Sequence, residues 1–128
     1  MQPSEIERWS RLLRARELTR AAIAQEAVEA RAIRARESAR AIARRLAAEP
    51  GVRRVILFGS LAGAGGQPHA DSDIDVAVEG LPREREAELY RALLDLTDLH
   101  VDLVRLEEAP PSLRRRIEED GEVLHGRP

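Results

Sequence analysis

The sequence predicts an α/β (α+β) protein in which helices flank a small mixed sheet and a long helical extension comes first. Two observations lead to this fold class. Residues 4–49 contain neither Gly nor Pro and consist mainly of good helix formers. After Pro50-Gly51, short apolar runs typical of strands alternate with amphipathic runs typical of helices. The length of 128 residues suits one small domain, and the shortage of aromatics (2%) leaves Leu, Val, Ile and Ala to form its core.

The first helix carries a thin heptad seam, and Ser4 with Glu7 has the pattern of a capping box at its start. Unbroken, the helix would be about 70 Å long at 1.5 Å per residue. Because Ala buries little area, residues 1–35 are predicted to form an extension that packs against a second copy or a partner chain. The alternative is a hairpin that bends near residues 18–25. The seam consists of Leu18, Ala21, Gln25, Val28, Ala32, Ala35, Ala39, Ile42 and Leu46.

Three strands are expected after residue 50, at "VRRVILF", "SDIDVAVEG" and "HVDLVRL", with a short edge strand at "EVLHG". Residues alternate between the two faces of a strand. Ile74, Val76 and Val78 therefore face one side of the second strand, and Asp73 and Asp75 face the other.

Two shorter helices are expected between and after these strands. The pattern over residues 81–98 predicts a helix with four inward leucines. Ser112 is the expected N-cap of the next helix, which should end at Gly121. The four leucines expected to be buried are Leu89, Leu93, Leu94 and Leu96.

Composition and charge exclude several classes of function. The chain has no Cys, which excludes disulfides, thiolate catalysis and Cys-based zinc sites. It has no run of membrane-spanning length and no signal-peptide pattern, so a cytoplasmic location is expected. Residues 1–50 carry 11 Arg against 7 Glu, whereas the rest is acidic. That balance argues against direct binding of nucleic acid by the sheet domain, because phosphates need a positive surface.

The pair Asp73 and Asp75 is the strongest sign of chemistry in the sequence. Their spacing puts both carboxylates on one face of a strand, where they repel each other unless a cation lies between them. Oxygen ligands of this kind suit Mg²⁺ or Mn²⁺. Asp102 joins them if its strand is a neighbour. His100 and His125 show no pattern typical of metal ligands. The alternative for the pair is acidic decoration of an exposed edge strand, and for Asp102 an isolated exposed carboxylate.

The Gly-rich loop before this pair is typical of a phosphate cradle. Gly59 permits a sharp turn at the end of a strand, and Ser60 offers an amide and a hydroxyl. Gly63, Gly65 and Gly66 would let a polyphosphate approach the backbone closely. The alternative is that these three glycines serve only as a connecting loop. A phosphate cradle beside paired carboxylates indicates metal-assisted phosphoryl or nucleotidyl transfer.

Together these residues resemble the signature of nucleotidyltransferases related to DNA polymerase beta, and in particular the minimal nucleotidyltransferases, or MNT proteins. The resemblance covers roughly residues 38–126, including "PPSLRRRI" and "GEVL", and sets the nucleotidyltransferase domain at 36–128. It implies that Gly59 and Ser60 hold the β- and γ-phosphates of a nucleoside triphosphate. Asp73 and Asp75 would bind two Mg²⁺ ions, and Asp102 would contact the second ion and help activate the acceptor. All three would be catalytic.

The resemblance also implies a partner and a reaction. Many MNT proteins are antitoxins paired with a helical HEPN ribonuclease toxin that carries an Arg-x-x-x-x-His motif, and some transfer AMP from ATP to a Tyr of that toxin. This chain differs from the family in the segment 61–72, which is two residues longer than usual, and in Gly63, where Arg is frequent. Two alternatives therefore stay open. One is a non-catalytic antitoxin that acts by binding, and the other, weaker one is transfer to a small molecule.

Overall fold

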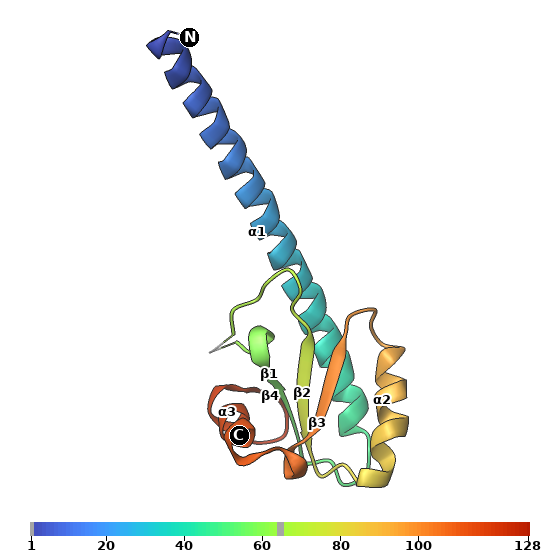
Figure 1. Ribbon diagram of the computed structural model, residues 1–128. Helices are drawn as coiled ribbons and strands as arrows, with labels where there is room; N and C mark the ends of the chain where they lie inside the picture. The colour runs from blue at the N-terminus through green and yellow to red at the C-terminus, as the bar shows by residue number, and fades with distance from the viewer. Residues whose placement is uncertain (1, 64–65) are drawn as a thin grey trace.

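The predicted fold class is confirmed by a computed structural model that describes residues 2–63 and 66–128. The extension, the flanking helices and the small sheet are all present (Figure 1). In chain order the elements are α1 (Pro3–Ala47), β1 (Arg54–Phe58), a 3₁₀ turn (Gly59–Leu61), β2 (Ile74–Glu79), α2 (Glu86–Leu94), β3 (Val101–Arg105), α3 (Pro111–Asp120) and β4 (Glu122–His125).

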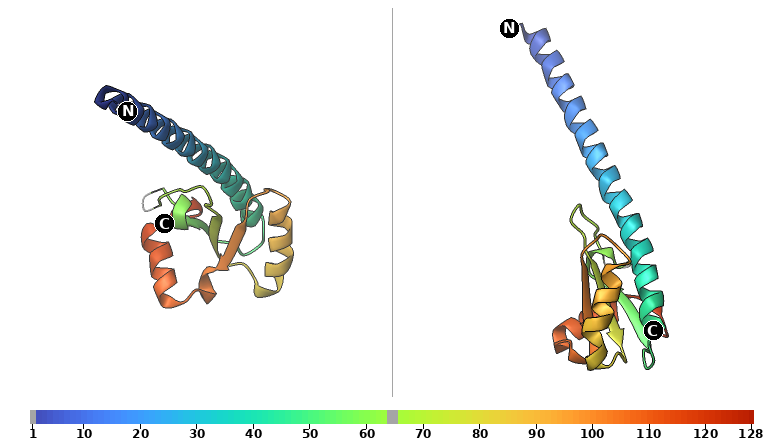
Figure 2. Two further views of the ribbon diagram at one scale, coloured as in Figure 1. Left: turned by 45° about the horizontal axis from the view of Figure 1, so that its top comes forward. Right: turned by 90° about the vertical axis from the view of Figure 1, so that its right-hand side faces the viewer.

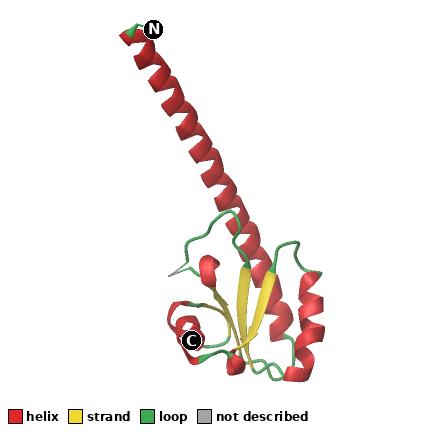
Figure 3. Cartoon of the chain, viewed as in Figure 1, coloured by secondary structure: helices red, strands yellow, loops and turns green. Residues whose placement is uncertain are grey.

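The sheet has the strand order β3-β2-β1-β4 and is mixed, as predicted. Strands β1 and β2 are antiparallel, as are β1 and β4, whereas β2 and β3 are parallel. The crossover from β2 to β3 runs through α2, which is the usual way for a chain to return to a parallel neighbour (Figure 3). The "EVLHG" segment forms the expected edge strand.

The two faces of the sheet are covered by different helices. The larger core lies under α1 and α2, where Ile74, Val76 and Val78 meet Ile42 and Leu46 of α1. The smaller core lies under α3, where Ile117 packs with Ile56 and Ala77. Figure 2 shows α1 and α3 on opposite sides of the sheet. Asp75 lies on the α3 side, because it alternates with Val76 and shares a face with Ala77.

The helix α1 is continuous from Pro3 to Ala47, so the hairpin alternative is wrong. No Gly or Pro interrupts it after Pro3, and its N-terminal half projects away from the domain (Figure 1). Residues 2–27 are exposed throughout, and Ala32 is the first buried residue of the helix. The C-terminal part of the predicted seam, from Ala32 to Leu46, packs on the chain's own sheet.

Three details of helix boundaries and burial differ from the sequence prediction. Pro3 occupies the first turn of α1 and Gln2 is the N-cap, so Ser4 lies inside the helix and forms no cap. Similarly, α3 begins at Pro111, which displaces Ser112 from the predicted N-cap position. Leu94 and Leu96 are exposed, because α2 ends at Leu94 and only Leu89 and Leu93 face the core. No helix in the described part of the chain is long and apolar enough to cross a membrane.

Candidate active site

The backbone pairing brings the predicted carboxylates into one row across the sheet. Phe58 of β1 lies opposite Asp75 of β2, and Asp75 lies opposite Asp102 of β3. Asp73 immediately precedes β2, so it lies two residues from Asp75 along the same face. The parallel pairing of β2 and β3 therefore places all three carboxylates at the same end of the sheet, on the face that α3 covers only in part.

The environment of Asp75 disfavours the charged form of its carboxyl group. Burial raises the pKa of its carboxyl from the ordinary 3.8 to about 6, and the neighbouring Asp102 and Asp73 carboxylates add to the rise, while His100 lowers it. None of the three aspartates forms an ion pair with an arginine among the described residues. Among the described residues, His100 is the one side chain in ion-pair contact that can offset the negative charge of this cluster, and it does so when it is protonated.

The metal-free protein is expected to lose stability as the pH rises through the range in which Asp75 ionises. Its folded-state pKa of about 6 lies above the ordinary 3.8, so the folded state binds this proton more tightly than the unfolded state. The contribution of Asp75 is thus most favourable below about pH 4 and declines up to about pH 6. Urea unfolding in EDTA would measure it, with Asp75→Asn as the comparison. The free energy of unfolding of Asp75→Asn should rise relative to that of the wild type between these pH values. If the difference in free energy between the two proteins stays constant, the prediction is contradicted.

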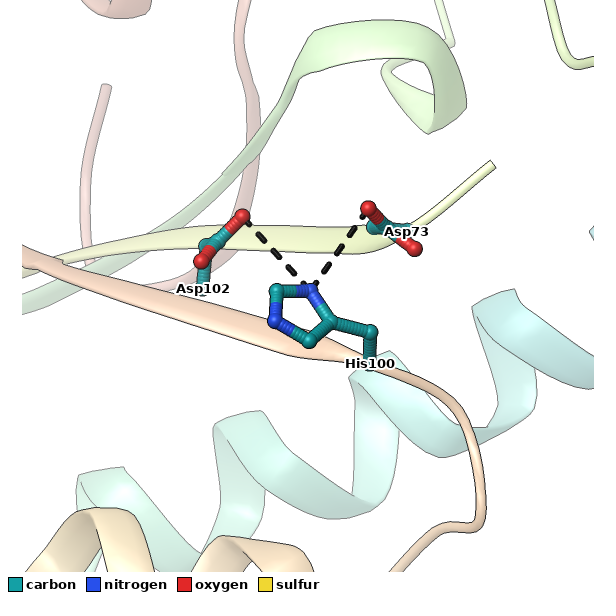
Figure 4. A group of neighbouring side chains, drawn as sticks. All are labelled: Asp73, His100 and Asp102. Atoms are coloured by element: carbon teal, nitrogen blue, oxygen red, sulfur yellow. Dashed lines mark ion pairs between the residues drawn. The ribbon is translucent and has the colours of Figure 1, made fainter. Parts of the chain in front are cut away.

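His100 also belongs to this cluster, although the sequence reasoning set it aside. Its Nδ1 atom lies 3.5 Å from Asp73 Oδ2 and 3.8 Å from Asp102 Oδ2 (Figure 4). One ligand atom of each residue lies within 4.8 Å of the others. The segment His100-x-Asp102 repeats the two-residue spacing of Asp73-x-Asp75 on the neighbouring strand, and this repetition is the signal that would have found it.

Gly59 forms the wall between the carboxylates and the loop that follows β1. Its φ is +77°, in the left-handed region that favours glycine, and a Cβ atom there would lie 2.3 Å from Asp75 Oδ2. The backbone therefore approaches the carboxylate row more closely than any side chain would allow. The 3₁₀ turn Gly59–Leu61 begins at this point and turns the chain away from the sheet.

Gly59→Ala is expected to lower the free energy of unfolding by roughly 1–3 kcal/mol, because the left-handed backbone conformation is strained for Ala and the new methyl group displaces the Asp75 carboxylate. Gly63→Ala is the matched control. Among the described residues, the nearest atom to a Cβ at that position would be Glu122 Oε2, at 3.6 Å. Urea unfolding of both variants tests the difference, and equal stabilities would show that the turn tolerates a side chain.

Ser60 is fixed by a residue that the sequence analysis did not select. A hydrogen bond of 2.9 Å joins its hydroxyl to that of Ser72, and the backbone N–H of His69 donates to the same Ser72 oxygen at 2.8 Å. Ser72 is fully buried, which is rare for a side chain so polar unless it is hydrogen-bonded. The two ends of the Gly-rich loop are thus tied together beside the carboxylates. Gly65, which the sequence assigned to the phosphate cradle, lies outside the described residues.

Two arginines of α1 hold this loop from the other side. Arg31 Nε donates to the carbonyl oxygen of Ser72 at 3.1 Å, and the Arg36 guanidinium donates to the carbonyl oxygen of Leu61 at 3.4 Å. Both acceptors are backbone carbonyls at the ends of the loop. The position of the loop therefore depends on the helix that also carries the extension.

A divalent cation fits the donor set of this site. Asp73, His100 and Asp102 each offer a ligand atom to one ion, and Asp75 adds a carboxylate beside Asp102. Among the described residues, only His100, when protonated, is a cationic side chain in ion-pair contact with these carboxylates. The raised pKa of Asp75 shows that ionisation is costly without a counter-charge. Such oxygen-rich sites favour Mg²⁺ or Mn²⁺. The turn at Gly59 and Ser60 borders the same site, because Gly59 lies against the Asp75 carboxylate.

Comparison with known proteins agrees with this geometry. A model of the family described as Polymerase beta, Nucleotidyltransferase matches residues 40–128. No curated protein matches the chain significantly. The chain belongs to the polymerase beta nucleotidyltransferase family.

Solved structures place the chain more narrowly, among the minimal nucleotidyltransferases. It is 28% identical to a chain of the toxin–antitoxin MntA-HepT, with a TM-score of 0.55 over 72% of this chain and 73% of the other. A toxin–antitoxin structure with AMP-PNP is 31% identical, with a TM-score of 0.57 over 69% and 73%. A complex of tri-AMPylated Shewanella oneidensis HEPN toxin with MNT antitoxin is 27% identical, with a TM-score of 0.55 over 73% of each chain.

Proposed function

We propose that this chain is an MNT antitoxin that transfers AMP from ATP to a hydroxyl group of a HEPN-type toxin. The observation that carries the proposal is the row formed by Asp75 and Asp102, with Asp73 beside it and the Gly59 turn against it. The similar structures support the substrate and the partner, since one contains AMP-PNP and another contains an AMPylated HEPN toxin bound to an MNT antitoxin.

In this proposal each residue has a separate task. Asp73, Asp75 and Asp102 would hold Mg²⁺ or Mn²⁺, which when bound supplies positive charge beside the reacting phosphate. The amides of Gly59 and Ser60 hold the β- and γ-phosphates, and the bond between Ser60 and Ser72 keeps that turn in place. Asp102 is the most accessible of the three carboxylates, with a side chain 56% exposed, and so can meet an acceptor from outside.

The transfer itself needs one bond made and one broken. The hydroxyl oxygen of the acceptor forms a bond to the α-phosphorus, and the bond from that phosphorus to the oxygen bridging it to the β-phosphate breaks. Pyrophosphate leaves with that oxygen. Asp102 accepts the proton of the hydroxyl, which is the general-base role that an exposed carboxylate beside the acceptor can fill. The carboxylate row therefore acts on the α-phosphate while the Gly59 turn holds the leaving group.

The test uses the full chain, ATP labelled on the α-phosphate, Mg²⁺ and a HEPN-type toxin that forms a complex with the chain. Label is expected on the HEPN protein, and removal of its acceptor tyrosine should prevent labelling. ATP labelled on the γ-phosphate should label nothing, which separates nucleotidyl transfer from phosphoryl transfer. Labelling by the γ-phosphate, or no labelling at all, would overturn the proposed reaction.

A second candidate is a non-catalytic antitoxin that neutralises the toxin by contact. Gly63, which stands where the family often has Arg, favours it, because the turn then lacks a cation that would meet phosphate. Under this reading the chain suppresses the ribonuclease activity of the HEPN protein without any nucleotide. Measuring suppression with and without ATP distinguishes the two candidates.

We further propose that the projecting part of α1 is an assembly surface, for a second copy of the chain or for the toxin. Ile6, Trp9, Leu12 and Leu13 are each at least half exposed near its end. Deleting residues 2–27 removes only exposed residues and leaves the buried part of α1 from Ala32 onward in place. Light scattering and toxin binding should show a smaller assembly or weaker binding. Unchanged mass and binding would refute this role.

A further inference from the structure

A pocket of about 460 Å³ lies beside the Gly59–Ser60 turn, on the same face of the sheet as the carboxylates. One wall is the turn itself, and the other is α3. Leu113, Arg116, Ile117 and Asp120 of α3 line it. Their spacing of three and four residues puts them on one side of the helix. The volume is within the range typical of small-molecule sites.

The pocket continues the carboxylate site rather than forming a separate one. Phe58 and Gly59 line it, and Phe58 is the cross-strand neighbour of Asp75. Gly59 also lies against the Asp75 carboxylate, because a Cβ atom added to Gly59 would lie 2.3 Å from Asp75 Oδ2. A ligand that has one phosphate at the carboxylates and extends past Gly59 and Ser60 therefore enters the space that α3 borders.

Arg116 is the one cationic side chain among the described residues that line this pocket. It is exposed and forms no ion pair with any described residue. Arg54, on the same face of the sheet, differs from Arg116 because its guanidinium is hydrogen-bonded to the carboxylates of Glu79 and Glu118. An arginine that faces a pocket without a carboxylate partner is suited to an anion, and its planar guanidinium matches phosphate oxygens.

We propose that Arg116 binds the terminal phosphates of the nucleoside triphosphate, and then the pyrophosphate that leaves. This inference rests on the proposed function and adds a residue to it. It assigns to α3 the phosphate-binding charge that the turn itself lacks at Gly63. Arg116 would also favour triphosphates over monophosphates, because it lines the pocket beyond Gly59 and Ser60, whereas none of the three aspartates lines it.

Asp120 lines the same pocket four residues further along α3. Arg116 and Asp120 form no ion pair in the described structure, so the guanidinium is free to meet a ligand. The Asp120 carboxylate opposes an anion in the pocket. Its removal should therefore strengthen phosphate binding, whereas removal of Arg116 should weaken it, and the two changes act in opposite directions on one measurement.

The test measures binding of inorganic pyrophosphate, ATP and adenosine to the full chain by calorimetry in the presence of Mg²⁺. Arg116→Ala is expected to weaken binding of pyrophosphate and ATP by roughly 10- to 100-fold, as for loss of a hydrogen bond to a charged group. Adenosine binding should not change. Arg115→Ala is the matched control, because Arg115 is the exposed neighbour on the same helix and does not line the pocket. Asp120→Asn should strengthen pyrophosphate binding.

Two of the possible outcomes contradict the role of Arg116 alone, and a third contradicts the proposed function as well. If the wild type binds pyrophosphate and ATP but Arg116→Ala and Arg115→Ala behave alike, the role of Arg116 is refuted and the proposed function stands. If Arg116→Ala weakens adenosine as much as pyrophosphate, the pocket binds the nucleoside and the phosphate assignment is wrong. If the wild type binds none of the three ligands, both proposals fail. Thermal unfolding of the variants checks that the fold is intact.

Discussion

Asp75→Ala is expected to reduce the proposed AMP transfer to a HEPN-type toxin by roughly 10³-fold or more while leaving the complex between the two proteins intact. Asp75 lies at the centre of the carboxylate row, between Phe58 and Asp102, so its loss removes the carboxylate that is central to the proposed site. Interactions that stabilise charge in the transition state commonly have effects of this size.

The assay would follow transfer of label from α-labelled ATP, with complex formation measured separately by gel filtration. Asp95→Ala is the control, because Asp95 is an exposed carboxylate at the end of α2, which covers the opposite face of the sheet from Asp75. If Asp75→Ala still neutralises the toxin as well as the wild type does, binding alone suffices for neutralisation. If Asp75→Ala retains the wild-type rate of transfer, the carboxylate row is not the catalytic site.

Mg²⁺ or Mn²⁺ is expected to raise the midpoint temperature of thermal unfolding, and Asp73→Asn is expected to remove most of that rise. A cation that binds only the folded state stabilises it by about 2.7 kcal/mol at 100 times its dissociation constant. For a domain of this size that corresponds to several degrees. In EDTA the variant should unfold at or above the wild-type temperature, because it has lost one of the three mutually repelling carboxylates.

Calorimetry or fluorescence with and without metal would measure the shift, and Asp95→Asn serves as the control for loss of a surface charge. His100→Ala extends the test to the residue that the structure added. Its Nδ1 lies 3.5 Å from Asp73, so removing it should weaken the metal response if it is a ligand. An unchanged response in Asp73→Asn would exclude this aspartate from the metal site.

The sheet and the placement of the carboxylates follow from local pattern. Alternation along "DIDVAV" fixes which side chains share a face, and burial of Ile74 and Val76 then forces Asp75 to the opposite side. That Asp102 lies opposite Asp75 depends on the parallel pairing of β2 and β3, which the sequence supported only through the helix between them.

The features that were mispredicted depend on context that a single segment does not carry. Pro3 and Pro111 both occupy first-turn positions, and in each helix the N-cap lies two residues before the expected serine, at Gln2 and Pro110. All four leucines of this segment are apolar, yet only Leu89 and Leu93 are buried. Tertiary packing decides which side of α2 faces the core, so Leu94 and Leu96 remain exposed. His100 is brought to the site by Val101 pairing with Ile74, a contact across 27 residues of chain. Local patterns cannot supply such a contact.

The continuity of α1 couples the direction of its projecting end to the sheet. Each residue of an α-helix adds about 1.5 Å and about 100° of rotation. One residue inserted after Ala27 would turn Trp9 and its apolar neighbours by about 100° around the axis while hardly lengthening the arm. Seven inserted residues would extend the arm by about 10 Å and return it to within about 20° of its first azimuth. The length of the projecting part of α1 and the direction in which its apolar side chains point can thus be varied separately.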